Sequence, residues 1–225
     1  MSGQQRIQAI LFDWAGTTVD FGSRAPAQVF VEIFRQRGVA ITVAEAREPM
    51  GRAKRDHIAA VVARPRVAQE WQRVHGQPAA EADVTAMYED FLPLQKSVLS
   101  EGSDVIAGIP ATMAWLRQRG IRIGSTTGYT RELMSVVAPL AAAQGYTPDV
   151  IVCSDEVSAG RPAPWLNLRA AAELRTDTAS NVMVVDDTIV GIQAGQAAGM
   201  MTVAVSLTGN AMGLALAEVC ALPAN

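Results

Sequence analysis

Short apolar runs alternate with amphipathic segments along most of the chain. The run 7–12 is apolar and β-prone and ends at Asp13, and Gly16 then begins a turn. Similar runs recur after Gly108, separated by segments whose apolar positions have helical spacing. The predicted strands are 7–12, 121–124, 150–153, 182–185 and 202–207, and the predicted helices are 113–119, 131–143, 165–174 and one ending at Ala198. This alternation predicts an α/β fold, a Rossmann-like doubly wound parallel sheet with helices on both faces.

A long helical insertion lies between the first two predicted strands. About a hundred residues separate these strands, whereas a βαβ crossover needs only about a dozen. Start signals occur at Pro26, at a capping box of Thr42 and Glu45, and at Glu48-Pro49, where a helix to about Val62 is expected. Two further helices are predicted at 67–75 and 81–97, the second with a kink at Pro93.

The insertion predicts two domains. Residues 1–21 and 100–225 are expected to form the α/β core, and residues 22–99 a helical cap over the carboxyl edge of the sheet. The expected linkers lie at 21–23 and 100–102.

Composition narrows the range of partners. The chain has 225 residues, of which 49% are hydrophobic and 18% charged, and its net charge is −3. This balance gives no overall basic surface for nucleic acid or anionic membranes, so any anionic ligand must be bound at a local site. No apolar run is long enough to span a membrane. Two cysteines, Cys153 and Cys220, are too few for a disulfide framework, and a cytoplasmic location is expected.

Several polar groups follow predicted strands, at the sheet edge where ligands of open α/β sheets bind. The loop after Asp13 has backbone N–H groups and two hydroxyls that can surround an oxyanion. Ser125 to Gly128 and Arg161 lie in equivalent places after later strands. Asp186 and Asp187 end another strand, and two adjacent carboxylates favour Mg²⁺. Each group alone also fits a common turn, a surface arginine or a helix cap.

The cap carries a second candidate group. Helical spacing would place Met50, Lys54 and His57 on one stripe. Arg52 and Arg55 lie beside the lysine, and cationic neighbours or burial lower the pKa of an amine, as Schiff-base formation requires. A solvated basic helix face is the alternative interpretation.

Taken together, these motifs resemble the phosphonoacetaldehyde hydrolases (phosphonatases) of the haloacid dehalogenase superfamily. The similarity runs in order from Ile7 to about Gly213, and its most specific parts are the Asp-Trp-Ala-Gly-Thr loop and Met-Gly-X-X-Lys-X-X-His in the cap. It implies a haloacid dehalogenase-like core and cleavage of the C–P bond of phosphonoacetaldehyde into acetaldehyde and phosphate. It further implies a homodimer joined through the cap helices.

The resemblance also implies roles for individual residues. Asp13 would be the nucleophile and, with the Ala15 carbonyl and Asp187, would bind Mg²⁺. Lys54 would form an imine with the substrate aldehyde. The surrounding substrate-binding residues would be Met50, Thr127, Gly128 and Arg161, with His57 and Tyr129 as candidates for proton transfer.

Two departures from the family pattern stand out. Some members carry a carboxylate four residues after the metal ligand, where this chain has Gly191, so Asp186 is a candidate to replace it. Family members also continue beyond the position of Asn225 into another strand and helix. A shortened, non-catalytic paralogue is therefore one alternative function.

A phosphomonoesterase or dehalogenase of the same superfamily is the other alternative. Many phosphatases of the superfamily have a general-acid Asp two residues after the nucleophile, where this chain has Ala15. Without that acid, the leaving group should need no proton on oxygen. An iminium on Lys54 provides such a leaving group, because C–P cleavage then yields a neutral enamine.

Overall fold

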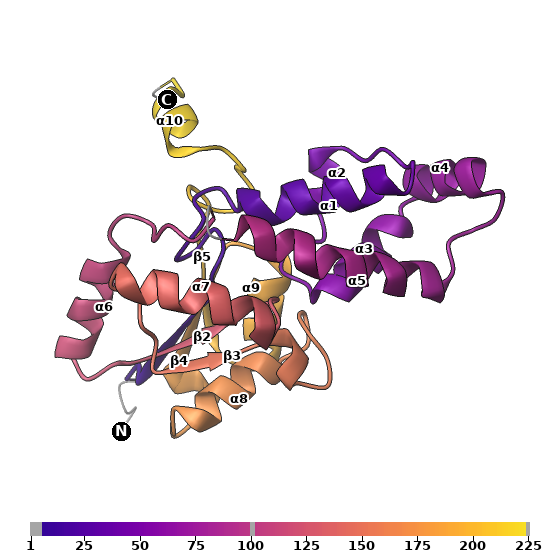
Figure 1. The fold of residues 1–225 in the computed structure, drawn as a ribbon. Helices are drawn as coiled ribbons and strands as arrows, with labels where there is room; N and C mark the ends of the chain where they lie inside the picture. Colours follow the sequence, from indigo (N-terminus) through magenta and orange to yellow (C-terminus); the bar gives the residue numbers. More distant parts are fainter. Residues whose placement is uncertain (1–5, 100–101, 224–225) are drawn as a thin grey trace.

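The structure, a computed structural model, describes residues 6–99 and 102–223. A parallel sheet with strand order β3-β2-β1-β4-β5 lies at the centre of this part of the chain (Figure 1). The strands are β1 (Ala9–Phe12), β2 (Arg122–Thr126), β3 (Val150–Val152), β4 (Val182–Asp186) and β5 (Met201–Ala204). The predicted α/β class with a parallel sheet is confirmed.

Helices cover both faces of the sheet, as the alternation of apolar runs predicts. Side chains of β1 alternate between two cores, because successive strand residues point to opposite faces. Phe12 packs with residues of α6 (Ile109–Gln118) and α7 (Arg131–Ala143), whereas Leu11 packs with residues of α8 (Trp165–Glu173). Helix α9 (Ile189–Ala197) contacts β4 and β5. Strands β2 and β3 lie on one side of β1, and β4 and β5 lie on the other. In open parallel sheets, a ligand-binding crevice forms at the carboxyl ends of the strands where the order changes sides, which here is at β1.

Residues 24–98 form a separate helical body, which we call the cap (Figure 1). The cap has an apolar core of its own, built around Phe30, Trp71 and Phe91, in addition to the two cores on the faces of the sheet. The predicted boundary residues Ser100 and Glu101 lie outside the described residues. The cap helices are α1 (Arg24–Gln36), α2 (Val43–Arg47), α3 (Lys54–Val62), α4 (Pro65–His75) and α5 (Glu81–Val98).

One predicted helix start in the cap is wrong, and one is confirmed. The capping box of α2 is present, with the Glu45 N–H donating to Thr42 Oγ1 at 3.1 Å and the Thr42 N–H donating to Glu45 Oε2 at 2.8 Å. The next helix begins at Lys54 and not at Glu48-Pro49. Gly51 has a φ of 92°, which is outside the helical region, so the residues between α2 and α3 cannot continue as one helix. Met50 is therefore not on the helix that carries Lys54.

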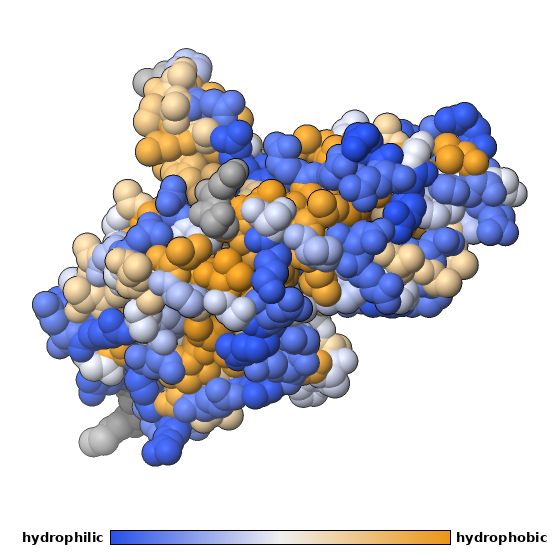
Figure 2. Space-filling model, in the orientation of Figure 1, coloured by the Kyte–Doolittle hydropathy of each residue, from blue (hydrophilic) through white to orange (hydrophobic). Residues whose placement is uncertain are grey.

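A last short helix, α10 (Leu216–Cys220), projects from the body near the end of the described chain (Figure 1). Figure 2 shows apolar surface gathered on this segment, where Leu216 and Leu222 are exposed. Two 3₁₀ turns, Ser154–Glu156 and Ala179–Asn181, complete the elements of this part of the chain. Among the described residues, every helix is too short or too polar to cross a lipid bilayer.

Candidate active site

Three buried carboxylates meet at the carboxyl end of the sheet. β1 and β4 are neighbours in register, with Phe12 opposite Val185, so the residues that follow them lie side by side. Oxygen atoms of Asp13, Asp186 and Asp187 all lie within 4.8 Å of one another. The predicted convergence of these groups at one edge is what the structure has.

The cluster favours a cation. Burial raises the pKa of Asp187 well above its usual value, and the neighbouring charges of Asp13 and Asp186 raise it further. Burial also raises the pKa of Asp186, although Arg161 opposes this. Carboxylate oxygens in such a group suit Mg²⁺, which would remove their repulsion. Asp13 and Asp187 could hold the ion, and Ala15 lines the same cavity as Asp13.

Arg161 is a buried partner of the acids, so its interpretation as a surface arginine is wrong. Its guanidinium Nη1 donates to Asp13 Oδ1 at 2.6 Å and lies 3.2 Å from Asp186 Oδ2. Its Nη2 donates to the carbonyl and hydroxyl oxygens of Thr126, both at 2.8 Å. Burial opposes the charge of Arg161, but Asp186 and Asp13 outweigh it and raise its pKa. The group therefore stays cationic beside the nucleophile candidate, where it can hold a phosphoryl oxygen.

Gly191 leaves room for Asp186. A Cβ atom at Gly191 would collide with the carboxylate of Asp186. The Asp186 carboxylate also accepts hydrogen bonds from the backbone N–H and hydroxyl of Thr188, at 2.8 and 2.7 Å. Asp186 thus places its carboxylate in the space beside position 191, and its replacement of the carboxylate expected there stays a prediction.

Transferring the carboxylate from position 186 to position 191 should preserve Mg²⁺ binding. We expect Asp186→Gly to weaken Mg²⁺ binding about tenfold or more, the usual effect of losing a residue that supports metal ligands. Gly191→Asp alone should also weaken it, because the new side chain collides with Asp186. The double variant Asp186→Gly, Gly191→Asp should recover most of the affinity, measured by calorimetric titration with Mg²⁺. A double variant that binds no better than Asp186→Gly would contradict this exchange.

The cap loop 50–53 is seated against the core, and glycines allow the close approach. A Cβ at Gly51 would collide with Thr188, and one at Gly128 would lie 2.7 Å from the Arg52 carbonyl oxygen. One at Gly160 would lie 3.1 Å from the Cβ of Ala53. Between cap and core remains a cavity of about 20 Å³, enough for about one water. Its lining includes the predicted residues Asp13, Ala15, Met50, Lys54, Thr127, Gly128, Tyr129 and Arg161.

Lys54 is the first residue of α3 and is 4% exposed. Its Nζ lies over the rings of Tyr129, Phe30 and Phe91, at 4.7, 5.5 and 6.0 Å from their centroids. Burial lowers the pKa of Lys54 to about 7; the Asp13 carboxylate opposes this shift and the Arg161 guanidinium adds to it. The lysine is thus unlike a solvated surface residue.

Burial, one of the two predicted causes, lowers the pKa of Lys54, but Arg52 and Arg55 are not the cations that add to this shift. Arg55 points to the exposed side of the cap, where it pairs with Glu81 and donates to Thr85. Neighbours on a helix diverge around its axis, so adjacency in sequence does not bring the charges together. The cation that acts on Lys54 is Arg161, from a loop of the core.

His57 and Tyr129 both lie close to Lys54, and burial shifts their pKa values in opposite directions. His57 is fully buried, its ring stacks on Phe30 at 3.6 Å, and its Nε2 bonds the Ala46 carbonyl at 2.8 Å. Burial, together with the charge of Lys54, holds the pKa of His57 well below its usual value, and its Nδ1 has no partner among the described residues. Burial raises the pKa of Tyr129 well above its usual value, so its hydroxyl keeps its proton near neutral pH.

The pKa of Lys54 predicts a pH profile. If the neutral amine is the reactive form, kcat/KM for an aldehyde substrate should rise about tenfold per pH unit below pH 7 and level off above about pH 8. A divalent cation at the acid cluster would move this rise to lower pH. Saturating Mg²⁺ at every pH is the control, since it holds the carboxylates in one state. A profile without a rise toward higher pH anywhere in the range where the protein stays folded would contradict the assignment.

Some residues at the site were not predicted from sequence. Ser23 lines the cavity, and its hydroxyl is buried without a partner among the described residues. Thr17 donates to Asp187 Oδ1 at 3.2 Å. Phe30 and Phe91 occupy apolar positions with helical spacing, so the sequence alone indicates ordinary core residues. Only their three-dimensional relation to Lys54 distinguishes them.

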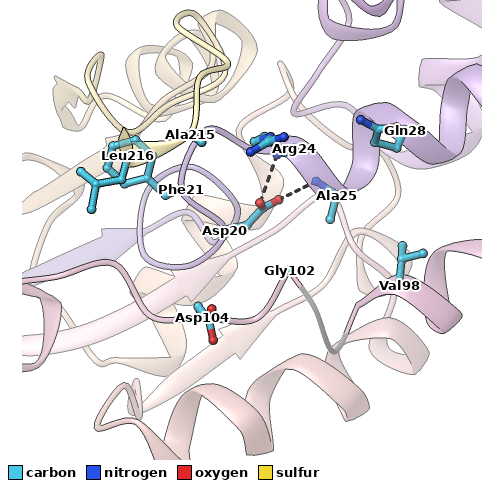
Figure 3. Close-up of a pocket in the computed structure, with 10 residues that line it drawn as sticks. All are labelled: Asp20, Phe21, Arg24, Ala25, Gln28, Val98, Gly102, Asp104, Ala215 and Leu216. Atoms are coloured by element: carbon cyan, nitrogen blue, oxygen red, sulfur yellow. Dashed lines mark hydrogen bonds between the residues drawn. The ribbon is translucent and has the colours of Figure 1, made fainter. Parts of the chain in front are cut away.

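A larger cavity, of about 590 Å³, lies at the linker to the cap (Figure 3). Its lining includes Asp20, whose carboxylate accepts hydrogen bonds from the backbone N–H groups of Arg24 and Ala25 at 3.1 and 3.2 Å. Burial raises the pKa of Asp20 to about 6. These bonds fix the start of α1 and hence the exit of the chain into the cap. The three clustered acids are not among the residues that line this cavity.

The family of the chain follows from comparison with known proteins. The model of the haloacid dehalogenase-like hydrolases matches residues 7–199, and the chain belongs to this family of hydrolases.

Its relatives define the group more narrowly. The phosphonoacetaldehyde hydrolase of Bacillus cereus strain G9842 is 50% identical over 214 residues, which are 95% of this chain and 81% of the relative. The phosphonoacetaldehyde hydrolase of Bacillus anthracis is 48% identical over the same shares. A crystal structure of a phosphonoacetaldehyde hydrolase-like protein from Oleispira antarctica superposes with a TM-score of 0.95 at 39% identity, covering 99% of this chain and 82% of the other. Within the hydrolase family, the chain is a member of the phosphonoacetaldehyde hydrolases.

Proposed function

We propose that this chain hydrolyses the C–P bond of phosphonoacetaldehyde to acetaldehyde and phosphate, with Lys54 as the imine-forming amine and Asp13 as the nucleophile. One observation carries the proposal: a buried lysine with a pKa of about 7 and a buried carboxylate line the same small cavity. A phosphate ester would require no such amine. The relatives named phosphonoacetaldehyde hydrolases support the choice of substrate.

The first half of the reaction belongs to Lys54. Its neutral amine adds to the aldehyde carbon, and loss of water gives an imine that is protonated to an iminium. The faces of Tyr129, Phe30 and Phe91 would stabilise this cation as they do the ammonium. His57, neutral and with an unpartnered Nδ1, is the proposed proton acceptor, and the Tyr129 hydroxyl the proposed hydrogen-bond donor.

The second half belongs to Asp13. Its carboxylate attacks phosphorus, the C–P bond breaks, and its electron pair moves into the carbon skeleton to give a neutral enamine on Lys54. Protonation of the enamine carbon and hydrolysis of the imine release acetaldehyde. Water then hydrolyses the aspartyl phosphate. Arg161 and Thr127 would hold phosphoryl oxygens, because both line the cavity beside Asp13.

Mg²⁺ is the proposed metal, and Asp13, Ala15 and Asp187 are its proposed ligands. When bound, the ion would neutralise the negative charge shared by the carboxylates and the phosphoryl group. The support is the cluster itself, in which burial and like charges raise the pKa of Asp187.

Borohydride trapping tests the imine. Only two lysines occur in the sequence, Lys54 and Lys96. Reduction in the presence of phosphonoacetaldehyde, followed by mass spectrometry of peptides, should place the adduct on Lys54. Lys96 is exposed and pairs with Glu132, so it reports non-specific reaction in the same sample. An adduct on Lys96 alone, or none, would exclude the imine.

We also propose that the enzyme is a cytoplasmic homodimer joined through cap helices. The support is the family resemblance and the free state of both cysteines, which suits a reducing compartment. Light scattering coupled to gel filtration measures the oligomeric state. A monomer at all concentrations would exclude the dimer without affecting the proposed reaction.

A further inference from the structure

An arginine of the cap is bound to the loop that follows β5. Arg47, the last residue of α2, donates from Nη1 to the carbonyl and side-chain oxygens of Asn210, at 3.3 and 3.2 Å. Its Nη2 donates to the Gly213 carbonyl at 3.3 Å. A hydrogen bond also runs in the opposite direction, because the Asn210 side-chain amide donates to the Arg47 carbonyl at 3.1 Å. Arg47 is thus held by residues more than 160 positions away in the chain.

The same loop is bound to the acid cluster. The backbone N–H of Asn210 donates to Asp187 Oδ2 at 2.7 Å. Gly209 packs directly on this aspartate, since a Cβ there would lie 2.5 Å from the Cβ of Asp187. Asn210 therefore contacts a cap residue through its side chain and a proposed metal ligand through its backbone.

The loop also contacts the linker and the nucleophile loop. The hydroxyl of Thr208 donates to the Gly16 carbonyl, and the Gly22 N–H donates to the Thr208 carbonyl, both at 2.7 Å. Arg47 Nη1 donates to the Gly22 carbonyl at 2.9 Å. Opening the cap by movement at the linker would pull Arg47 away from Asn210 and Gly213, or move the loop with it.

We propose that Arg47 and Asn210 are positioning residues that couple closure of the cap to the orientation of Asp187, so that the closed cap and bound Mg²⁺ stabilise each other. The inference rests on the metal site of the proposed function, but not on the identity of the substrate. Coupling of this kind is reciprocal: if the closed cap tightens Mg²⁺ binding, Mg²⁺ must favour the closed cap by the same factor.

The first test is Mg²⁺ binding by calorimetric titration of metal-free enzyme. Arg47→Ala and Asn210→Ala should each weaken binding about fivefold or more, and the double variant should be no weaker than the single ones, because both remove the same link. Arg47→Lys keeps the charge but cannot reach several carbonyls at once, so it should resemble Arg47→Ala. The matched control is Arg37→Ala, which removes an ion pair with Asp90 inside the cap and should change binding less than twofold.

The second test follows the cap itself. Modification of buried Lys54 by trinitrobenzenesulfonate requires opening, and exposed Lys96 in the same sample is the reference. Mg²⁺ should slow Lys54 modification in the unsubstituted enzyme several-fold and have little effect in Arg47→Ala. A folded Arg47→Ala or Arg47→Lys variant with unchanged Mg²⁺ affinity, or with undiminished protection of Lys54 by Mg²⁺, would overturn the coupling. Failure to hydrolyse phosphonoacetaldehyde would overturn the proposed function and leave both measurements standing.

Discussion

Lys54→Arg is expected to lower kcat/KM for phosphonoacetaldehyde by at least about 10³-fold, comparable to losing a member of a covalent catalytic set. The arginine keeps a cation at this position, next to the aromatic rings. A guanidinium does not deprotonate in proteins and so cannot add to the aldehyde. The measurement is steady-state hydrolysis, with acetaldehyde and phosphate determined separately.

Lys96→Arg is the matched control, because it changes an exposed lysine paired with Glu132 and should keep nearly full activity. Circular dichroism establishes that Lys54→Arg is folded. Treatment of Lys54→Arg with borohydride and phosphonoacetaldehyde should give no adduct at position 54. A folded Lys54→Arg enzyme with more than a few per cent of the original activity would mean that C–P cleavage proceeds without an imine.

Asp13→Asn is expected to reduce turnover by a similar factor while leaving the imine intact. The amide retains the size of the carboxylate but is a poor nucleophile toward phosphorus. Lys54 keeps its burial and aromatic contacts, so borohydride should still attach the substrate to it. Loss of one negative charge should also lower the pKa of Lys54, because Asp13 opposes the effect of burial there.

The two measurements separate the two roles. Trapping at Lys54 in Asp13→Asn should reach the level of the unsubstituted enzyme, and no phosphate should be released. Asp186→Asn is a useful comparison, because it changes another Arg161 partner without removing the nucleophile. If folded Asp13→Asn cannot be trapped, or still releases phosphate at a substantial rate, the division of roles between Asp13 and Lys54 is wrong.

The fold was largely predictable because its signals are local. Short continuous apolar runs that end at an aspartate mark β1 and β4, and the capping box of Thr42 and Glu45 marks the start of α2. The predicted start of α3 failed for a tertiary reason. Glu48-Pro49 has the local chemistry of a helix start, but Gly51 adopts a left-handed conformation as the loop is pressed onto Thr188.

The convergence of the site was predictable in part. Strand-end positions in a parallel sheet share one edge, so the meeting of Asp13 with Asp187 follows from topology. The surroundings of Lys54 did not follow, because Phe30, Phe91 and Arg161 come from three distant segments. The bond between Arg47 and Asn210 likewise spans the cap and the last loop, and neither residue has a motif that indicates it.

The small volume beneath the cap has a consequence for chemical selectivity in the cell. A lysine with a pKa of about 7 is partly neutral at physiological pH and would react with many metabolic aldehydes. With the cap seated, the space beside it admits about one water and no such aldehyde. Entry of an aldehyde into this space would therefore require the cap to move away from the core. If Arg161 binds the phosphonate as proposed, an aldehyde that lacks a phosphonate would not stabilise the closed cap. Lys54 would then form few unproductive imines with other aldehydes.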